Sequence, residues 1–291
     1  MSQEAVPRVD VACVVVAYRS GDILPGFLDS IELASPGIPV LIVNNDVADD
    51  EPARIAQARP TVRAITSASN LGYGGGANLG VAESVPSDWI IIANPDVTVD
   101  VDAIVQLLAA ARRFPDAGIL GPRILNPDGT VYPSARALPT LRTGLGHALF
   151  ANVSPSNPWT TRYHAFDELS TVDPSAVGWL SGAFLFARRE LFEKLGGFDE
   201  RFLMYFEDTD LGRRVGLAGM SNLYVPAAMI VHEGGHSTRT RHAQMTITHH
   251  RSAYRYVAGR HPEWYVAPIR WGLRLALFVR ARWEVFRGRV S

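Results

Sequence analysis

Residues 89–96 read Trp-Ile-Ile-Ile-Ala-Asn-Pro-Asp, and this stretch decides the fold. A short apolar run that ends in a turn signal is typical of a buried strand. Pro95 ends the strand because proline has no N–H to donate to a neighbouring strand. Asp96 is therefore expected at the carboxyl edge of a sheet, where open α/β sheets bind ligands. An acid there either caps the next turn or holds a divalent cation against a diphosphate.

The other apolar runs predict alternating short strands and helices. Strands are expected at 11–17, 40–43, 62–66, 179–186 and 223–231, and helices at 23–34, 52–58, 75–84, 101–113, 188–195 and 202–217. This alternation predicts an α/β fold, a Rossmann-like, mostly parallel sheet flanked by helices. Residues 122–178 are rich in Pro, Asn, Ser and Thr and show no sustained period, which is typical of a functional or mobile connection.

Composition places the chain among ordinary globular proteins. It has 291 residues, of which 47% are hydrophobic and 20% charged. Cys13 is the only cysteine, which excludes a disulfide framework and a cysteine-based zinc site. The N-terminus shows no basic-then-apolar leader, so a reducing, cytoplasmic setting is expected.

Charge is distributed unevenly along the chain. Residues 211–291 hold thirteen arginines against three glutamates, although the net charge of the whole chain is −1. From Trp264 onward arginines alternate with large apolar residues, and the apolar run 275–279 is far shorter than the ~20 residues that span a bilayer. This pattern favours a basic amphipathic helix on an anionic membrane surface over a nucleic-acid partner. The alternative is a helix packed on the main domain with a solvated basic face.

Residues 70–80 form a glycine-rich segment, Asn-Leu-Gly-Tyr-Gly-Gly-Gly-Ala-Asn-Leu-Gly. Glycines permit close backbone approach, and amides at the start of a following helix favour a phosphate. Ala77 stands where the dinucleotide fingerprint needs its last glycine, and the segment follows the third expected strand rather than the first. The pattern therefore argues against a nicotinamide-dependent oxidoreductase, and a flexible turn is the alternative to a phosphate loop.

An acidic cluster follows two aromatic residues in Tyr-Phe-Glu-Asp-Thr-Asp, residues 205–210. In a helix Glu207 and Asp210 share a face while Asp208 points elsewhere, and acids in a first turn also suit the helix dipole. Aromatic neighbours can raise the pKa of an acid by desolvation, which suits a general base. Further along, His232 ends an expected strand and precedes glycines, a sign of backbone crowding near a site.

Five motifs in order carry a resemblance to a known family: 14–18, 70–80, 94–96, 196–200 and 205–211. Residues 11 to about 240 resemble a family 2 inverting glycosyltransferase with the GT-A fold. Residues 121–125 with 127–130 resemble the bacterial rhamnosyltransferase branch. The resemblance implies transfer of L-rhamnose from dTDP-rhamnose to a polyprenyl-diphosphate-linked N-acetylglucosamine in cell-wall linker or polysaccharide synthesis. Such an enzyme is expected to be cytoplasmic and peripheral at the inner face of the plasma membrane.

The resemblance also implies roles for individual residues. Asp208 would be the general base and Glu207 would orient the acceptor, while Asp96 and His232 would bind a divalent metal, Mg²⁺ or Mn²⁺. The nucleotide-sugar donor would be bound by Ala17, Tyr18, Asn44, Asp46, Asn70, Gly72, Gly74, Asn78 and Asn94. The family usually has Asp where Asn44 stands and Ser where Val47 stands. An Asn amide offers both a donor and an acceptor to a pyrimidine, so the choice between uracil and thymine stays open.

The expected domain organisation has two parts. Residues 1–240 form the GT-A domain, with a nucleotide-sugar half at about 1–121 and an acceptor half at 122–240, and residues 241–291 form the basic amphipathic appendage. One alternative function keeps the fold and uses another nucleotide sugar, galactofuranose or a hexose. A more distant one is a non-catalytic sugar-nucleotide binding module, against which the pair Glu207-Asp208 argues. The sequence leaves a homodimer open.

Overall fold

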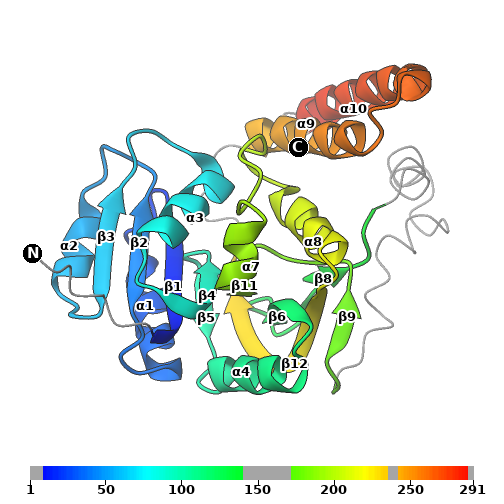
Figure 1. The fold of residues 1–291 in the computed structure, drawn as a ribbon. Coiled ribbons are helices and arrows are strands. Elements are labelled where there is room, and N and C mark those ends of the chain that lie inside the picture. The colour runs from blue at the N-terminus through cyan, green and yellow to red at the C-terminus, as the bar shows by residue number, and fades with distance from the viewer. Residues whose placement is uncertain (1–8, 140–171, 235–241, 288–291) are drawn as a thin grey trace, which may run out of the picture.

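The computed structural model describes residues 9–139, 172–234 and 242–287. Its first part alternates strands and helices (Figure 1): β1 (Val9–Ala17), α1 (Leu24–Ala34), β2 (Val40–Asn44), α2 (Glu51–Gln57), β3 (Val62–Thr66), α3 (Gly72–Glu83) and β4 (Ser87–Ala93). Then follow β5 (Val97–Val99), α4 (Ala103–Arg113), β6 (Ala117–Leu125), β7 (Val131–Tyr132) and β8 (Ala135–Arg136).

The remaining elements complete the sheet and add two long helices. They are β9 (Ser175–Val177), β10 (Trp179–Leu180), β11 (Phe184–Arg188), α7 (Arg189–Lys194), α8 (Glu207–Leu217), β12 (Ser221–His232), α9 (His242–Arg260), the 3₁₀ turn η2 (Trp264–Val266) and α10 (Ala267–Arg287). Residues 140–171, most of the irregular connection expected at 122–178, lie outside the described part of the chain. Its described parts form the end of β6 and the short strands β7 to β9.

The main sheet has the strand order β3-β2-β1-β4-β11-β6-β12-β5. Strands β3, β2, β1 and β4 are parallel, whereas β11 runs antiparallel between β4 and β6. Ala17, the last residue of β1, pairs with Asn44, the last residue of β2. Ala93, the last residue of β4, pairs with Val15, two residues before the end of β1. The loops after β1, β2 and β4 therefore leave the sheet at one edge, as the parallel pattern predicts.

Helices cover both faces of this sheet. On one face α1 and α4 share a hydrophobic cluster, through Phe27 and Leu107, with the odd-numbered side chains of β1, including Cys13. On the other face α3, α7 and α8 share a second cluster with the even-numbered ones; α3 packs on β1 and β2, α7 on β4 and β11, and α8 on β6, β10 and β12. Burial also raises the pKa of the Cys13 thiol, consistent with its position in the core. The expected α/β architecture is confirmed.

Two elements differ from the sequence prediction for a physical reason. Helix α8 begins at Glu207 rather than near residue 202, because Tyr205 and Phe206 have φ of 68° and 69°. Such left-handed conformations cannot continue a right-handed helix. The strand expected at 179–186 is split into β10 and β11, and the turn between them contains Gly182.

Helices α9 and α10 form a hairpin beyond α8 (Figure 1). Both helices lie in the C-terminal segment 241–291, which was expected to be helical, and α9 contacts the segment that precedes α8. Ser252 Oγ donates to the Met204 carbonyl at 2.8 Å, and the His249 ring lies 5.3 Å from the ring of Tyr205. The expected boundary at residue 240 lies outside the described residues. No helix in the described ranges is both long and apolar enough to cross a membrane.

Candidate active site

The carboxyl end of β4 and the end of β12 bring three of the predicted residues together. His232 Nε2 lies 3.1 Å from Asp96 Oδ1 and 3.4 Å from Asn94 Nδ2. The Glu233 N–H donates to the Asp96 carbonyl at 3.0 Å, which fixes the two chain segments against each other. A carboxylate and an imidazole thus meet at the sheet edge, although 136 residues separate them in the sequence.

Asp208 lies in the first turn of α8 and is held by backbone donors. Its Oδ2 accepts the Gly182 N–H at 3.0 Å, and its Oδ1 accepts the Thr209 N–H at 2.7 Å. Burial raises the pKa of Asp208, while these N–H groups and the positive charge of Arg136 act in the opposite direction. The carboxylate is therefore fixed in direction and more basic than an ordinary aspartate.

Glu207, beside it, is only 6% exposed. Burial, and then the charge of Asp208, raise the pKa of Glu207 well above its usual range. Glu207 Oε2 is buried and has no hydrogen-bond partner among the described groups. Two carboxyl groups so placed resist ionising together, and a buried oxygen without a partner is a position where a substrate group can bond.

Tyr73 connects the two carboxylate clusters. Its hydroxyl donates to the Gly182 carbonyl. Burial raises the pKa of Tyr73 well above its usual value, and the charges of Glu207, Asp208 and Asp96 add to this effect. The charges of all three acids therefore act on one buried phenol.

The turn before α8 is strained. Tyr205 and Phe206 both adopt positive φ, which is costly for residues with large side chains. Rings of α9 pack against them: the Phe206 ring lies 5.5 Å from that of His249 and 5.5 Å from that of Tyr256. Strain of this kind persists where surrounding structure enforces it, and it clusters at functional sites.

The glycine-rich segment is a packed helix and not a flexible turn. Gly72 has φ of 74°, and a Cβ there would lie 2.3 Å from the Leu203 carbonyl oxygen. A Cβ on Gly76 would lie 2.8 Å from Val16 Cγ1, and one on Gly80 would lie 2.3 Å from Val14 Cγ1. Glycines four residues apart thus let α3 approach the sheet closely.

Several residues predicted to bind the nucleotide use their polar atoms within the protein. The Gly72 N–H donates to Asn70 Oδ1 at 2.8 Å, and Asn78 clamps Phe198 by accepting its N–H at 2.8 Å and donating to its carbonyl at 2.9 Å. The buried amide of Asn44 donates to the Asp49 carbonyl at 2.6 Å and accepts the Asp46 N–H at 3.0 Å. Because these polar atoms bond to the protein itself, they hold the loops around the site in shape rather than offering unbonded groups to a nucleotide.

The loops after β1 and β2 meet through a charged contact. Arg19 Nε lies 2.7 Å from Asp46 Oδ2, and its guanidinium carbon lies 5.4 Å from the centre of the Tyr18 ring. Ala17 is buried beneath them. The predicted residues Ala17, Tyr18 and Asp46 are thus gathered at the same sheet edge.

Three residues of the site, Arg136, Tyr73 and Gly182, were not indicated by the sequence, and a fourth, Asn45, lies within the edge 44–46 that was expected around the nucleoside. Asn45 ties β2 to α3 by donating to the Gly72 carbonyl at 2.8 Å, and Arg136 places its guanidinium 5.6 Å from the Trp179 ring centre. Tyr73 and Gly182 complete the set. Tyr73 stood inside a segment noticed for its glycines, while nothing in the residues around Arg136 marked it.

The described residues contain no group of three or more His, Cys, Asp or Glu side chains arranged to hold a metal ion. Asp96 and His232 are the two predicted ligands that lie together. The remaining ligands of any bound cation would have to come from substrate or water.

Comparison with known proteins shows the family. Residues 7–255 match the family model "Glycosyltransferase like family 2", and the chain belongs to this family of glycosyl-transferring enzymes. It is 44% identical over 281 residues to the N-acetylglucosaminyl-diphospho-decaprenol L-rhamnosyltransferase of Mycobacterium tuberculosis, across 92% of this chain and 90% of that protein. It is 36% identical over 89 residues to rhamnosyltransferase WbbL of Escherichia coli, across 31% of this chain and 34% of that protein.

Solved structures confirm the GT-A fold. The mannosyltransferase PcManGT from Pyrobaculum calidifontis, in complex with GDP-Man and Mn²⁺, superposes with a TM-score of 0.57 at 16% identity, covering 99% of this chain and 82% of that one. GalNAc-T7 with UDP, GalNAc and Mn²⁺ gives a TM-score of 0.57 at 14% identity and covers 79% of this chain. The likeness spans 44% of the GalNAc-T7 chain, less than half of it.

Proposed function

We propose that this enzyme transfers L-rhamnose from dTDP-rhamnose to N-acetylglucosamine carried on a polyprenyl diphosphate, with inversion at the anomeric carbon. The observation that carries the proposal is the 44% identity, over nearly the whole of both chains, to a mycobacterial enzyme whose name states that reaction. The buried pair Glu207-Asp208 beside the sheet edge supports it, because the pair supplies a general base where a donor and an acceptor can meet.

Asp208 removes the proton of the acceptor hydroxyl. As that oxygen bonds to the anomeric carbon from one side, the bond to the departing diphosphate breaks on the other side, so the configuration inverts and no enzyme-linked sugar forms. The N–H groups of Gly182 and Thr209 hold the carboxylate in place. Burial raises the pKa of this carboxyl, and the same N–H groups, followed by the charge of Arg136, oppose that rise.

Glu207 positions the acceptor. Its Oε2 has no partner among the described groups, so a neighbouring hydroxyl of the acceptor sugar can bond there. The raised pKa of Glu207 lets it hold a proton while Asp208 carries the negative charge. One carboxyl group thus orients the sugar and the other accepts the proton.

Asp96 and His232 would hold Mg²⁺ or Mn²⁺. One carboxylate and one imidazole 3.1 Å apart suit such a cation, which commonly takes one or two protein ligands and completes its coordination with phosphate oxygens and water. When bound, the metal would neutralise charge on the departing diphosphate. Asp96→Ala should weaken metal-dependent donor binding by about tenfold or more, measured by calorimetry with and without a chelator; unchanged metal dependence would remove Asp96 from this role.

The nucleoside would lie at the loops after β1 and β2. Tyr18 offers a half-buried ring there, and Asn44 sets the shape of the loop that ends at Asp49. Gly74, at the start of α3, and Asn94, beside His232, would contact the diphosphate of the donor. Residues 1–121 would then serve the donor, 122–240 the acceptor and 241–291 the membrane.

The hairpin presents an apolar face to solvent. Its exposed large side chains, each more than half exposed, are Trp264, Tyr265, Ile269, Trp271, Leu275, Phe278, Val279 and Trp283. With the surrounding arginines, this face suits an anionic membrane surface, here the inner face of the plasma membrane. Replacing Trp271 and Phe278 by Ser should release the enzyme from phosphatidylglycerol-containing vesicles in a sedimentation assay, whereas Val101→Ser, at an exposed site on the main domain, should not.

A product assay tests the proposed reaction. The enzyme is given dTDP-rhamnose, UDP-galactofuranose or UDP-hexoses in turn, with polyprenyl-diphosphate-linked N-acetylglucosamine as the acceptor. Transfer from dTDP-rhamnose alone is the expected result. Transfer from another donor would replace rhamnose in the proposal, and donor binding without any transfer would indicate a binding module.

A further inference from the structure

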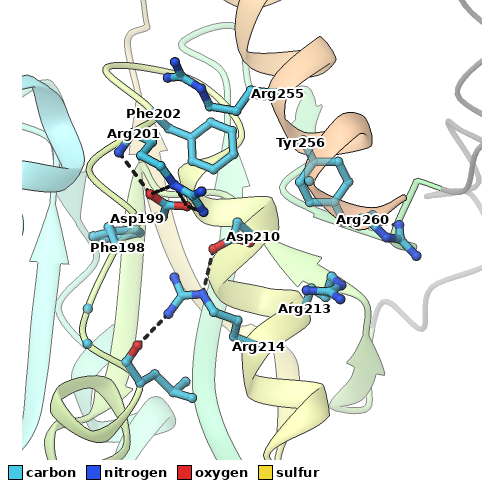
Figure 2. Close-up of a pocket in the computed structure, with 14 residues that line it drawn as sticks. Phe198, Asp199, Arg201, Phe202, Asp210, Arg213, Arg214, Arg255, Tyr256 and Arg260 are labelled. Atoms are coloured by element: carbon cyan, nitrogen blue, oxygen red, sulfur yellow. Dashed lines mark hydrogen bonds and ion pairs between the residues drawn. The ribbon is translucent and has the colours of Figure 1, made fainter. Parts of the chain in front are cut away.

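A cavity of about 340 Å³ lies on the side of α8 that faces the hairpin (Figure 2). Its walls are the loop after α7, one face of α8 and one face of α9. Asp208 lines no part of it. Residues 208 and 210 are about 200° apart around a helix, so Asp210 faces this cavity while Asp208 faces Gly182.

Five arginines line the cavity: Arg201, Arg213, Arg214, Arg255 and Arg260. The two acids in its walls are already paired, Asp199 with Arg201 at 2.6 Å and Asp210 with Arg214 at 2.6 Å, as Figure 2 shows. Arg213 and Arg255 have no ion pair or hydrogen bond with any described residue. Arg260 bonds only to neutral groups there, the Pro139 carbonyl and the Tyr256 hydroxyl.

Three positive charges around this cavity are therefore not neutralised by described carboxylates. Like charges lining one partly buried space repel one another, so a bound anion would relieve this repulsion. Guanidinium groups present paired N–H donors that match phosphate oxygens. Arg214 adds a buried Nη2 that donates to no described acceptor.

The size and place of the cavity point to the source of the anion. Sites for small molecules span roughly 300–1,000 Å³, and this cavity is at the small end, which suits a head group better than a whole nucleotide sugar. One of its walls is α9, the first helix of the hairpin whose second helix carries the exposed aromatic face. A phosphate borne by a membrane lipid would reach the protein on this side.

We propose that this arginine-lined cavity is a second anion site, which binds the phosphate or diphosphate group of a membrane lipid. The lipid is either an anionic phospholipid or the polyprenyl diphosphate of the acceptor, and only the second source rests on the proposed function. In both cases the site anchors a lipid head group beside α8, on the side away from Asp208.

The first test measures binding of inorganic pyrophosphate to the full chain in the presence of a chelator, which removes any metal-bridged diphosphate at the candidate active site. Arg213→Gln and Arg255→Gln should each lower the affinity about tenfold. Arg112→Gln is the matched control, since Arg112 is an exposed arginine of α4, on the main domain, that does not line this cavity. Equal affinities for the cavity variants and the control would overturn the proposal.

Two further arms identify the lipid. The first arm measures transfer in detergent without phospholipid. If a cavity variant raises the KM for the polyprenyl acceptor tenfold and leaves kcat and the donor KM unchanged, the site belongs to the acceptor. In sedimentation with phosphatidylcholine vesicles that contain phosphatidylglycerol, a larger loss of binding for the cavity variants than for Arg112→Gln assigns it to phospholipid. Pyrophosphate should also raise the Tm of the unmodified chain in chelator, because a ligand that binds only the folded state stabilises it; an unchanged Tm would overturn the proposal without relying on any variant.

Discussion

Helix α8 has two nearly opposite faces, and they differ in the sign of their uncompensated charge. One face holds Asp208, in contact with backbone N–H groups and with no cation bonded to it in the described structure. The other face holds Arg213 and the pair Asp210–Arg214, next to a cavity with an excess of positive charge. A helix that only served packing would gain stability by neutralising both faces. The difference in charge is what the two proposals require, with a hydroxyl proton received on one face and a phosphate bound on the other.

The largest expected effect comes from removing the carboxylate of the first face. Asp208→Asn should lower transfer about a thousandfold, because a general base contributes roughly 10²- to 10⁴-fold. Donor binding should persist, as measured by calorimetry beside a product assay. Asp210→Asn makes the same chemical change on the opposite face and should keep transfer within about threefold. Similar losses for both variants would mean that the faces do not differ in the way described.

The packing along α8 can be compared at two of its glycines, Gly212 and Gly216. A Cβ on Gly212 would lie 2.6 Å from Trp179 Cβ and 3.0 Å from the Gly178 carbonyl oxygen. Gly212→Ala should therefore cost about 2 kcal/mol of unfolding free energy and displace Asp208, with a loss of transfer. Urea denaturation and the product assay measure the two effects, and a variant as stable and active as the parent would contradict this packing.

The third prediction concerns the pH dependence of stability. Because the pKa of Glu207 is raised in the folded state, the folded protein keeps a proton that the unfolded chain releases above its ordinary value of 4.5. Stability should fall as pH rises from that value toward the raised pKa. Glu207→Gln should remove this fall and add about 1 kcal/mol at pH 7, while lowering transfer. Thermal unfolding across this pH range tests it; an equally steep fall in the variant would assign the slope to other groups.

The smallest effect is expected at Gly216, where a Cβ would meet no atom within 4 Å. Gly216→Ala should stabilise the protein by about 0.5 kcal/mol through helix propensity and leave transfer unchanged. Measured beside Gly212→Ala, it separates the general benefit of alanine from the local clash. A destabilising result would show that this end of α8 is packed more closely than the structure indicates.

The sequence predicted features that depend on neighbouring residues and missed features that depend on residues far apart in the chain. The strand before Asp96 and the parallel arrangement around it follow from apolar runs and turn signals, which are local. The conformation of Tyr205 and Phe206 could not be read in this way, because rings of α9, about forty residues further on, hold it. Asn78 had the right chemistry for a ligand, and only the position of Phe198 reveals that its amide is already engaged. Arg136 was missed because a lone arginine carries no pattern.

The contact between α9 and the turn before α8 has a consequence for protein engineering. Ser252, His249 and Tyr256 touch Met204, Tyr205 and Phe206, so α9 supports the segment that positions the acids. A chimera or truncation with its junction near residue 240 would remove this support together with the hairpin. A loss of activity in such a protein would therefore not be a test of membrane binding. The junction for exchanging the apolar face with that of another enzyme is His261–Glu263, between α9 and η2. A graft made there would carry η2 and α10 and leave the turn on its native support.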